Sequence, residues 1–291
     1  MPLCLIPDEV SHDPGTAFEL ARRWGIERFE IRYAYRWRVP VGPDWVAGRV
    51  AALVAEHGVR VGGVSPGLFK PTMQTDGSTI PIGIDTPDEI RRHLDELLPR
   101  CFAFAERVGT RHVTVFALPR GAAPAGSEAP QIVIDTLGAA AARAEPEGFE
   151  LRVENVAGSW ADHGAAAAAI LAAVNSPALR LTWDPANVAH ALADEDPVET
   201  GYPLVRRFVA NVHVKDVAMT GGKPTWTMLG DGIIDWPAQL RRIAADGYRG
   251  PITAEPHLQY VPGCGARLVE TVERFVTRLR KLIHSTRGLT A

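Results

Sequence analysis

The repeated alternation of short apolar runs with longer stretches of helical periodicity constrains the fold of this chain more than any other feature. Short apolar or alternating runs predict strands, and stretches that open on proline or close before glycine predict helices. The predicted strands cover residues 3–7, 28–32, 59–64, 112–117, 149–154, 179–184, 211–215 and 251–255. The predicted helices cover residues 15–24, 43–57, 87–108, 130–144, 164–174, 202–208, 236–246 and 265–283.

Eight strand–helix units in 291 residues predict an α/β fold, a single (β/α)8 TIM barrel with residues 1–291 as one domain. A doubly wound open sheet is the alternative, but no Gly-x-Gly-x-x-Gly pattern follows the first predicted strand. Two long segments, residues 66–87 and 217–235, follow the third and seventh strands. A barrel places them on its C-terminal face, as tolerated insertions or as lids over a substrate.

Charge and cysteine content exclude several classes of protein. The chain has 31 basic and 34 acidic residues, so it lacks the strong positive field that collects nucleic acid or an anionic membrane. Its three cysteines are scattered without C-x-x-C spacing, which suits a reducing compartment. The longest apolar run, residues 165–174, is too short to span a bilayer, and no basic segment typical of a signal peptide opens the chain. We therefore expect a cytoplasmic protein without nucleic-acid or membrane partners.

Polar and apolar residues alternate along the predicted strands, so they occupy opposite faces. Because helices cover the outside of a barrel, the apolar face must point outwards and the polar face inwards. Arg152 and Arg180 lie towards the N-terminal ends of their strands. Buried charges need partners, so we expect both arginines to form structural ion pairs in the barrel floor, with Glu30 as their partner.

The last polar residues of the final four strands are three carboxylates and an imidazole: Glu154, Asp184, His213 and Glu255. In a barrel these four side chains converge at the C-terminal mouth. Three adjacent carboxylates repel one another, and a divalent cation removes that conflict. An oxygen-dominated ligand set favours Mn, with Mg, Co or Zn as alternatives. The pattern therefore predicts a site for one divalent cation.

Six residues near the predicted strand ends are candidates for substrate binding: His12, Arg32, Asn187, His190, Lys215 and His257. Two of them have structural alternatives, because Arg32 is placed to pair with Glu9, and Lys215 with Asp216 or another acid at the rim. Asn187, together with Asn155, is expected to hydrogen-bond the metal ligands.

The strings VENVAG, TWDPAN, VHVKD, LGDGIIDW and ITAEPH resemble the sugar phosphate isomerase/epimerase superfamily, the xylose-isomerase-like barrels, and the resemblance extends along the whole chain. The resemblance implies that Glu154, Asp184, His213 and Glu255 are the metal ligands. In the ketose epimerases of this superfamily the first and last glutamates also move the proton. That catalytic role is thereby assigned to Glu154 and Glu255.

Some motifs depart from the ketose 3-epimerase pattern. No arginine follows Glu154 in ENVAGSW, Asn187 stands where those enzymes carry a histidine, and HVKDVAM lacks their substrate-holding arginine. The VHVKD string looks more like the inosose dehydratase branch and uncharacterised isomerase branches. Asn187 and the lack of a basic surface set aside the endonuclease IV branch, which needs further ligands for three zinc ions.

The expected function is a divalent-metal-dependent isomerase or epimerase of a small keto-sugar or polyol, acting by proton abstraction and a metal-held enediolate. One alternative is a lyase on the same scaffold, of inosose or dehydroshikimate dehydratase type or a 3-keto-glycoside eliminase. Another is a non-catalytic barrel subunit, which the four retained ligands disfavour. Without a phosphate-cradling motif an unphosphorylated substrate is expected, and self-association into a homo-oligomer is left open.

Overall fold

The computed structural model describes residues 1–70, 86–192 and 194–287. Eight parallel strands form a closed barrel in the order β1-β12-β9-β8-β7-β6-β5-β2. The barrel strands are β1 (Leu3–Leu5), β2 (Arg28–Ile31), β5 (Arg60–Leu68), β6 (His112–Val115), β7 (Glu150–Glu154), β8 (Leu179–Trp183), β9 (Val209–Val214) and β12 (Ile252–Ala254). The ring closes where β1 pairs with β12 on one side and β2 on the other. The predicted TIM barrel is therefore confirmed.

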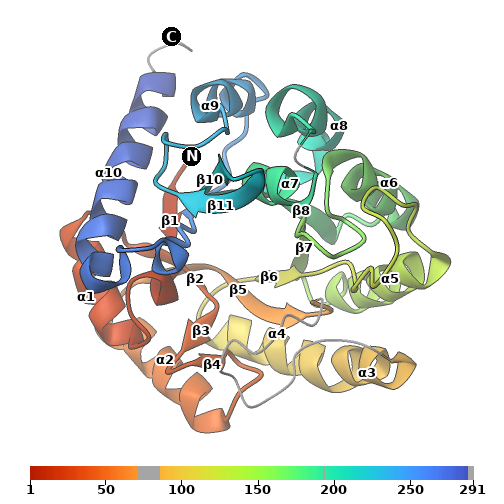
Figure 1. Ribbon diagram of the computed structural model, residues 1–291. Helices are drawn as coiled ribbons and strands as arrows, with labels where there is room; N and C mark the ends of the chain where they lie inside the picture. Colours follow the sequence, from red (N-terminus) through yellow and green to blue (C-terminus); the bar gives the residue numbers. More distant parts are fainter. Residues whose placement is uncertain (71–85, 193, 288–291) are drawn as a thin grey trace.

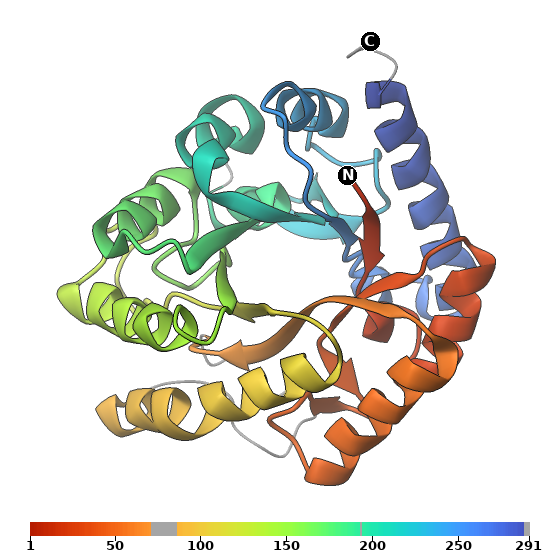
Figure 2. The same ribbon diagram turned by 180° about the vertical axis from the view of Figure 1, so that it is seen from behind.

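Helices surround the barrel on its outer side, and Figure 1 looks along the axis of this ring. They are α1 (Pro14–Arg23), α2 (Asp44–His57), α3 (Pro87–Arg92), α4 (Leu98–Arg107), α5 (Gln131–Ala144), α6 (Gly164–Val174), α7 (Pro185–Ala191), α8 (Tyr202–Val205), α9 (Trp236–Ala245) and α10 (Leu268–Arg287). Seen from both faces, α10 lies between α9 and α1 (Figures 1 and 2). The Arg280 guanidinium on α10 donates to the Trp24 carbonyl just after α1, which ties the end of the chain to its beginning.

The barrel has an apolar outer layer and a polar interior, as the alternation predicts. Leu151, Val153, Leu181 and Trp183 are completely buried between the strands and the helices. The opposite face of the same sheet carries charged and polar groups, of which His213 is 1% exposed. Such a buried polar interior is stable only when its groups bond one another or a ligand.

Two short hairpins extend the barrel at its C-terminal mouth. The first joins β3 (Tyr33–Ala34) and β4 (Trp37–Arg38) directly after β2. The second joins β10 (Asp216–Thr220) and β11 (Lys223–Thr227) after β9, and it lies over one side of the mouth in Figure 1. The long segment predicted at 217–235 is therefore mostly an ordered hairpin. Within the other long segment, 66–87, residues 71–85 lie outside the described part of the chain.

Several predicted boundaries differ from the structure, and the third strand and the helix predicted at 202–208 are two examples. The third strand continues to Leu68, beyond the predicted end at residue 64. The helix predicted at 202–208 is α8, preceded by a turn of π-helix (Pro197–Gly201) and followed by a 3-10 turn (Arg206–Phe208). Within the described residues no helix is long and apolar enough to cross a membrane.

Candidate metal centre and active site

The four predicted metal ligands lie together at the C-terminal mouth of the barrel. Glu154 ends β7, Asp184 directly follows β8, His213 lies on β9, and Glu255 directly follows β12. All four side chains are buried, and each offers a ligand atom within 4.8 Å of the others. The structure thus brings together groups from four strands in the manner that the sequence predicts.

Asp184 is held by the start of a short helix that the sequence pattern did not reveal. Its Oδ1 accepts a hydrogen bond from the backbone N–H of Asn187 at 3.0 Å and so caps α7. The Asn155 side chain fixes the backbone of Asp184 in both directions, accepting from its N–H at 2.8 Å and donating to its carbonyl at 2.7 Å. These contacts leave Oδ2 of Asp184 directed at the cluster.

His213 spans the space between the barrel interior and the acidic cluster. Its Nε2 lies 3.0 Å from Oε2 of Glu30, which is itself bonded to Thr114 and Asn211. Its Nδ1 lies 3.1 Å from Glu255 Oε2 and 3.4 Å from Glu154 Oε1. Burial would lower the pKa of His213, but Glu30, Glu154 and Glu255 outweigh burial and raise it, which favours protons on both ring nitrogens. With Nε2–H held by Glu30, a cation at the cluster would take the place of the Nδ1 proton.

The donor set fits a divalent cation. Asp184 Oδ2 and His213 Nδ1 are both buried and lie among charged groups, with Oδ2 2.7 Å from the Lys215 ammonium and Nδ1 3.1 Å from Glu255 Oε2. Three buried carboxylates in one cluster repel one another, and a cation between them and the imidazole would balance their charge. Three carboxylates with one imidazole suit a hard or borderline divalent ion. The group is therefore consistent with a divalent metal site.

Lys215 adds a positive charge to this cluster. Its Nζ lies 2.7 Å from Asp184 Oδ2 and 2.8 Å from Glu255 Oε2, and the residue is 2% exposed. Burial would lower the pKa of Lys215, but the two carboxylates reverse this effect and raise it above its ordinary value. The predicted alternative of an ion pair with an acid at the rim is thus confirmed, although the acids are Asp184 and Glu255.

Asp216 is not the partner of Lys215, because backbone amides use its carboxylate. It accepts hydrogen bonds from the N–H groups of Val217, Gly230, Gly232 and Ile234. These bonds fasten the β10–β11 hairpin to the LGDGIIDW segment that follows it.

Glu154 and Glu255, to which the resemblance assigns a catalytic role, both favour the ionised form. Burial would raise the pKa of Glu154, but the charge of His213 outweighs it and lowers the pKa. Burial acts in the same way on Glu255, where Lys215, His257 and His213 hold the pKa well below its ordinary value. Burial raises the pKa of Asp184 despite Lys215. Glu154 and Glu255 therefore have the protonation state that a general base needs.

A second charged network adjoins Glu255. Arg32 contacts Glu9 at 2.6 Å, Asp8 at 2.7 Å, and Glu255 through its other terminal nitrogen. The predicted Arg32–Glu9 pair is confirmed, and Asp8 and Glu255 are additional partners. His257 donates its backbone N–H to Glu9 at 2.9 Å, with its Nδ1 3.0 Å from the same carboxylate. Burial would raise the pKa of Glu9, but His257 and Arg32 lower it to about 2.

Aromatic rings border the mouth on the side of the β10–β11 hairpin. His190 stacks on Trp226 with ring centres 5.1 Å apart, and His257 meets the same indole edge-on at 5.0 Å. The Lys215 ammonium lies 5.2 Å from the centre of that indole. Two predicted substrate residues, His190 and His257, thus share one neighbour, Trp226, and lie beside the acidic cluster.

The remaining predicted substrate residues have different surroundings. Asn187 donates to Glu154 Oε1 at 3.2 Å and to the Asn155 carbonyl at 2.8 Å, so its expected bond to a metal ligand is confirmed. His12 is exposed, and its carbonyl accepts from the Tyr35 N–H at 2.6 Å. This backbone bond gives His12 no role at the cluster.

Glu30 was predicted to be the ion-pair partner of Arg152 and Arg180, and this prediction is wrong. Arg152 pairs with Glu150 at 2.7 Å, and Arg180 donates to the Arg207 carbonyl at 2.9 Å on the partly exposed rim. Glu30 instead bonds Thr114, Asn211 and His213 in the interior. The strands are staggered, so residues at similar depth in their own strands do not face one another.

Two basic side chains at the mouth were not identified from the sequence. Arg38 lies on the β3–β4 hairpin and is 4% exposed, and Lys70 lies two residues after the end of β5 and is half-buried. The sequence contains little to identify them, because neither residue lies in a predicted strand. Arg38 belongs to the aromatic segment RYAYRWRVP, which follows the second predicted strand.

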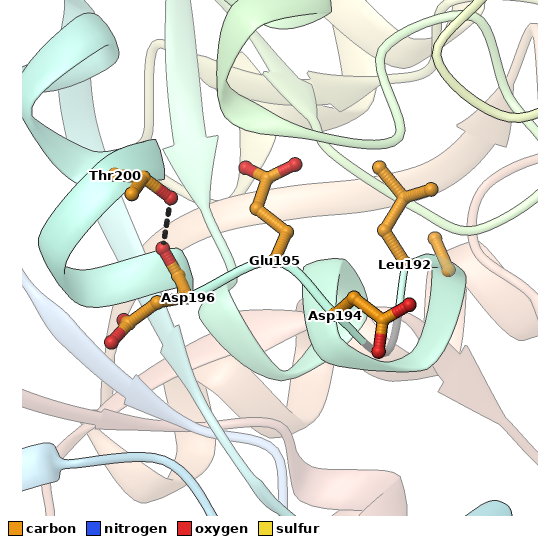
Figure 3. A pocket seen from close by; sticks show the side chains of 6 residues that line it. Leu192, Asp194, Glu195, Asp196 and Thr200 are labelled. Carbon is orange, nitrogen blue, oxygen red and sulfur yellow. Dashed lines mark hydrogen bonds between the residues drawn. The ribbon is translucent and has the colours of Figure 1, made fainter.

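A separate surface hollow of about 660 Å³ lies beyond the C-terminal end of α7 and contains none of the predicted site residues. Figure 3 shows its lining, in which the Thr200 hydroxyl donates to the Asp196 carbonyl at 2.5 Å. The neighbouring acids Asp194 and Glu195 give it a negative character. It has no unpartnered buried group in the described chain, so the acidic cluster at the barrel mouth remains the candidate site.

Comparison with known proteins places the chain in a family. None of the curated proteins compared matches it. Three solved structures are similar over nearly their full lengths. A xylose isomerase domain protein from Alicyclobacillus acidocaldarius has 21% identity and a TM-score of 0.68, with 99% of this chain and 100% of that chain covered. An L-ribulose 3-epimerase has 18% identity and a TM-score of 0.72, with 100% and 97% covered. The probable 3-DHS dehydratase AsbF from Bacillus anthracis has 12% identity and a TM-score of 0.68, with 96% and 99% covered.

The family model described as "Xylose isomerase-like TIM barrel" matches residues 18–283. This match includes all four residues of the buried cluster. The chain belongs to the xylose isomerase-like TIM barrel family.

Proposed function

We propose that this protein is a divalent-metal-dependent isomerase or epimerase of a small keto-sugar or polyol. The observation that carries the proposal is the convergence of Glu154, Asp184, His213 and Glu255, which are all buried and offer ligand atoms within 4.8 Å of one another. Similarity to sugar-converting enzymes such as the L-ribulose 3-epimerase supports it. We assign the metal to these four residues, with Mn preferred.

Proton transfer is assigned to the two ionised glutamates. A bound divalent ion would polarise a ketone and its neighbouring hydroxyl, which acidifies the adjacent C–H bond. Glu154 and Glu255 approach the same His213 nitrogen, at 3.4 and 3.1 Å, so they flank one point at the mouth. One glutamate removes the proton as a general base, and the other returns a proton to the enediolate after taking one up from solvent. The first glutamate then loses its proton to solvent, which restores both carboxylates. The choice of carbon decides between isomerisation and epimerisation.

The surrounding residues orient the substrate and the bases. Lys215 donates to Glu255 and lies close enough to the cluster to bind a substrate oxygen. Arg32 and His257 hold Glu255 from the opposite side. Trp226, stacked on His190, offers an apolar ring face to the carbon skeleton of a sugar.

The test is proton exchange in deuterated water. The purified protein is incubated with ketopentoses and ketohexoses, with Mn, Mg, Co or Zn or with a chelator, and the sugars are examined by mass spectrometry. We expect deuterium in the recovered ketose or its isomer, with exchange lost after chelation. Absence of exchange with every metal and every ketose contradicts the proposal.

A lyase is the second candidate, because one specific contact favours it. Lys215 is a buried ammonium 2.7 Å from Asp184, placed to donate a proton to a departing hydroxyl. A dehydratase is also among the structural neighbours. In the same experiment with inosose and dehydroshikimate, loss of water from the substrate supports the lyase, whereas deuterium in an intact carbon skeleton supports the isomerase.

A further inference from the structure

Arg38 and Lys70 differ from the other basic side chains around the acidic cluster. Arg32 and Lys215 contact three and two carboxylates respectively. In contrast, neither Arg38 nor Lys70 forms an ion pair with any residue that the structure describes. A buried charge without a counter-charge costs several kcal/mol on an order-of-magnitude scale, so such groups are rare unless a ligand completes them.

The guanidinium of Arg38 is fixed in place. Its terminal Nη1 donates to the Ser65 carbonyl on β5 at 3.0 Å, and its Cζ lies 4.2 Å from the centre of the Tyr33 ring. Its Nε is buried and has no hydrogen-bond partner within the described chain. The side chain is thus held rigidly while one N–H donor is left for a ligand.

Lys70 lies on the same side of the mouth. It follows the end of β5, the strand that carries Ser65, and its ammonium lies 5.2 Å from the centre of the Phe116 ring. Burial and the charge of Arg38 lower the pKa of Lys70 to about 7. Burial and the charge of Arg32 lower the pKa of Arg38 to about 9. The lowered pKa values of Arg38 and Lys70 indicate that nearby acids do not balance the positive charges of these two side chains.

The two cations face the same cluster that is proposed to hold the metal. Glu154 and Glu255 act electrostatically on both Arg38 and Lys70. These carboxylates already have His213 and Lys215 as partners. A divalent ion bound there would add positive charge, which leaves the two basic groups still without a counter-charge.

We propose that Arg38 and Lys70 form a subsite for an anionic group of the substrate, either a carboxylate or a phosphate. This inference rests on the proposed function and narrows its substrate class to anionic keto-sugars, such as sugar acids or sugar phosphates. A phosphate in the subsite would depart from the expectation of an unphosphorylated substrate, whereas a carboxylate would agree with it. The chemistry of recognition is a charge-assisted hydrogen bond from the free Nε of Arg38, with the Lys70 ammonium as a second positive charge.

The test compares three ligands that differ in charge. Calorimetric titration of the full-length, Mn-loaded protein gives dissociation constants for D-fructose, D-fructose 6-phosphate and 5-keto-D-gluconate. We expect one anionic ligand to bind at least about tenfold more tightly than D-fructose. The better anion identifies the subsite as one for phosphate or for carboxylate. Equal affinity for all three ligands overturns the proposal.

Matched variants distinguish anion binding at Arg38 and Lys70 from a general electrostatic attraction of the protein for anions. Arg38→Met and Lys70→Met should each weaken the anionic ligand by roughly tenfold and leave D-fructose unchanged. Arg38→Lys should retain part of the preference. Lys281→Met removes an exposed lysine from α10 and should change nothing. Circular dichroism and melting curves establish folding, and Lys70→Met, at a half-buried position, remains informative if Arg38→Met does not fold. Unchanged anion binding in folded Arg38→Met and Lys70→Met overturns the proposal.

Failure of this inference is distinguishable from failure of the proposed function. Deuterium exchange on neutral ketoses without any preference for anions refutes the subsite and leaves the isomerase intact. A preference for an anion that Arg38→Met abolishes, without exchange on any ketose, supports the subsite and contradicts the isomerase.

Discussion

Glu30 lies behind His213, with its Oε2 3.0 Å from Nε2 of the imidazole. The carboxylate is 2% exposed and is itself fixed by the Thr114 hydroxyl at 3.0 Å and the Asn211 amide at 2.9 Å. This arrangement orients the ring so that Nδ1 faces the acidic cluster. Glu30 is therefore a positioning residue for a candidate metal ligand rather than a floor anion for the arginines.

Glu30→Gln should weaken metal binding. The neutral amide removes the charge that favours a proton on Nε2, and loss of such a partner costs about 10- to 100-fold in metal affinity. Titration of the metal-free protein with Mn measures the effect without any need for substrate. Glu27→Gln, which alters an exposed glutamate paired with Arg60, is the matched control. Equal affinity in both variants contradicts the role of Glu30.

Glu154→Gln and Glu255→Gln should each abolish deuterium exchange. The amide keeps an oxygen for the metal but accepts no proton, so a fall of at least about 1,000-fold is expected for either change at saturating metal. Asn187→Ala, which removes the 3.2 Å hydrogen bond to Glu154, should have a smaller effect of roughly tenfold on exchange. Exchange at ordinary rates in either glutamine variant refutes the assigned proton transfer.

The sequence pattern predicted the barrel and its acidic quartet, because both depend on local alternation and on the position of a residue within its own strand. The placement of Glu30 depends on the stagger between strands and on side-chain length, which the pattern does not contain. The helix α7 was missed because Asp184 both follows β8 and caps the helix, within a single proline-containing turn. Arg38 was missed because its place at the mouth depends on a two-residue hairpin strand that folds back over β5.

Arg180→Met should have only a modest effect on stability. The Arg180 guanidinium donates one hydrogen bond, to the Arg207 carbonyl, and the side chain is partly exposed. We therefore expect the free energy of unfolding to fall by about 0.5–1.5 kcal/mol. Urea denaturation of the variant and the parent protein measures the difference. A loss of 3 kcal/mol or more, the order found when one partner of a buried ion pair is removed, contradicts this reading of Arg180.

Glu150 should make stability depend on pH at the N-terminal end of the barrel. Burial would raise the pKa of Glu150, but His112 and Arg152 outweigh it and lower the pKa to about 2. The native state thus favours the ionised form, so this stabilisation is present above the unfolded pKa, near 4.5, and is lost as the pH falls towards 2. Because the side chain is partly exposed, the expected size is about 1–2 kcal/mol.

The measurement compares Glu150→Gln with the parent protein by urea denaturation at pH 6 and at pH 3. The variant should be less stable at pH 6, and the difference should shrink at pH 3. Glu145→Gln, at an exposed position at the end of α5, serves as the control. A difference that stays constant between the two pH values contradicts the ion pair as its cause.

Asp216→Asn should loosen the β10–β11 hairpin without affecting the barrel. The carboxylate accepts from Gly230 at 2.8 Å and Val217 at 2.9 Å, with longer bonds to Gly232 and Ile234. An amide group in its place directs N–H donors at backbone N–H groups, at a cost of about 1–3 kcal/mol.

Hydrogen–deuterium exchange should therefore accelerate over residues 216–234 and stay slow in β7 and β8. Asp231→Asn changes an exposed acid of the same segment, paired with Arg278, and should leave exchange unchanged. Because Trp226 lies on this hairpin and stacks on His190, Asp216→Asn should also weaken sugar binding. Equal exchange in the two variants contradicts the fastening role of Asp216.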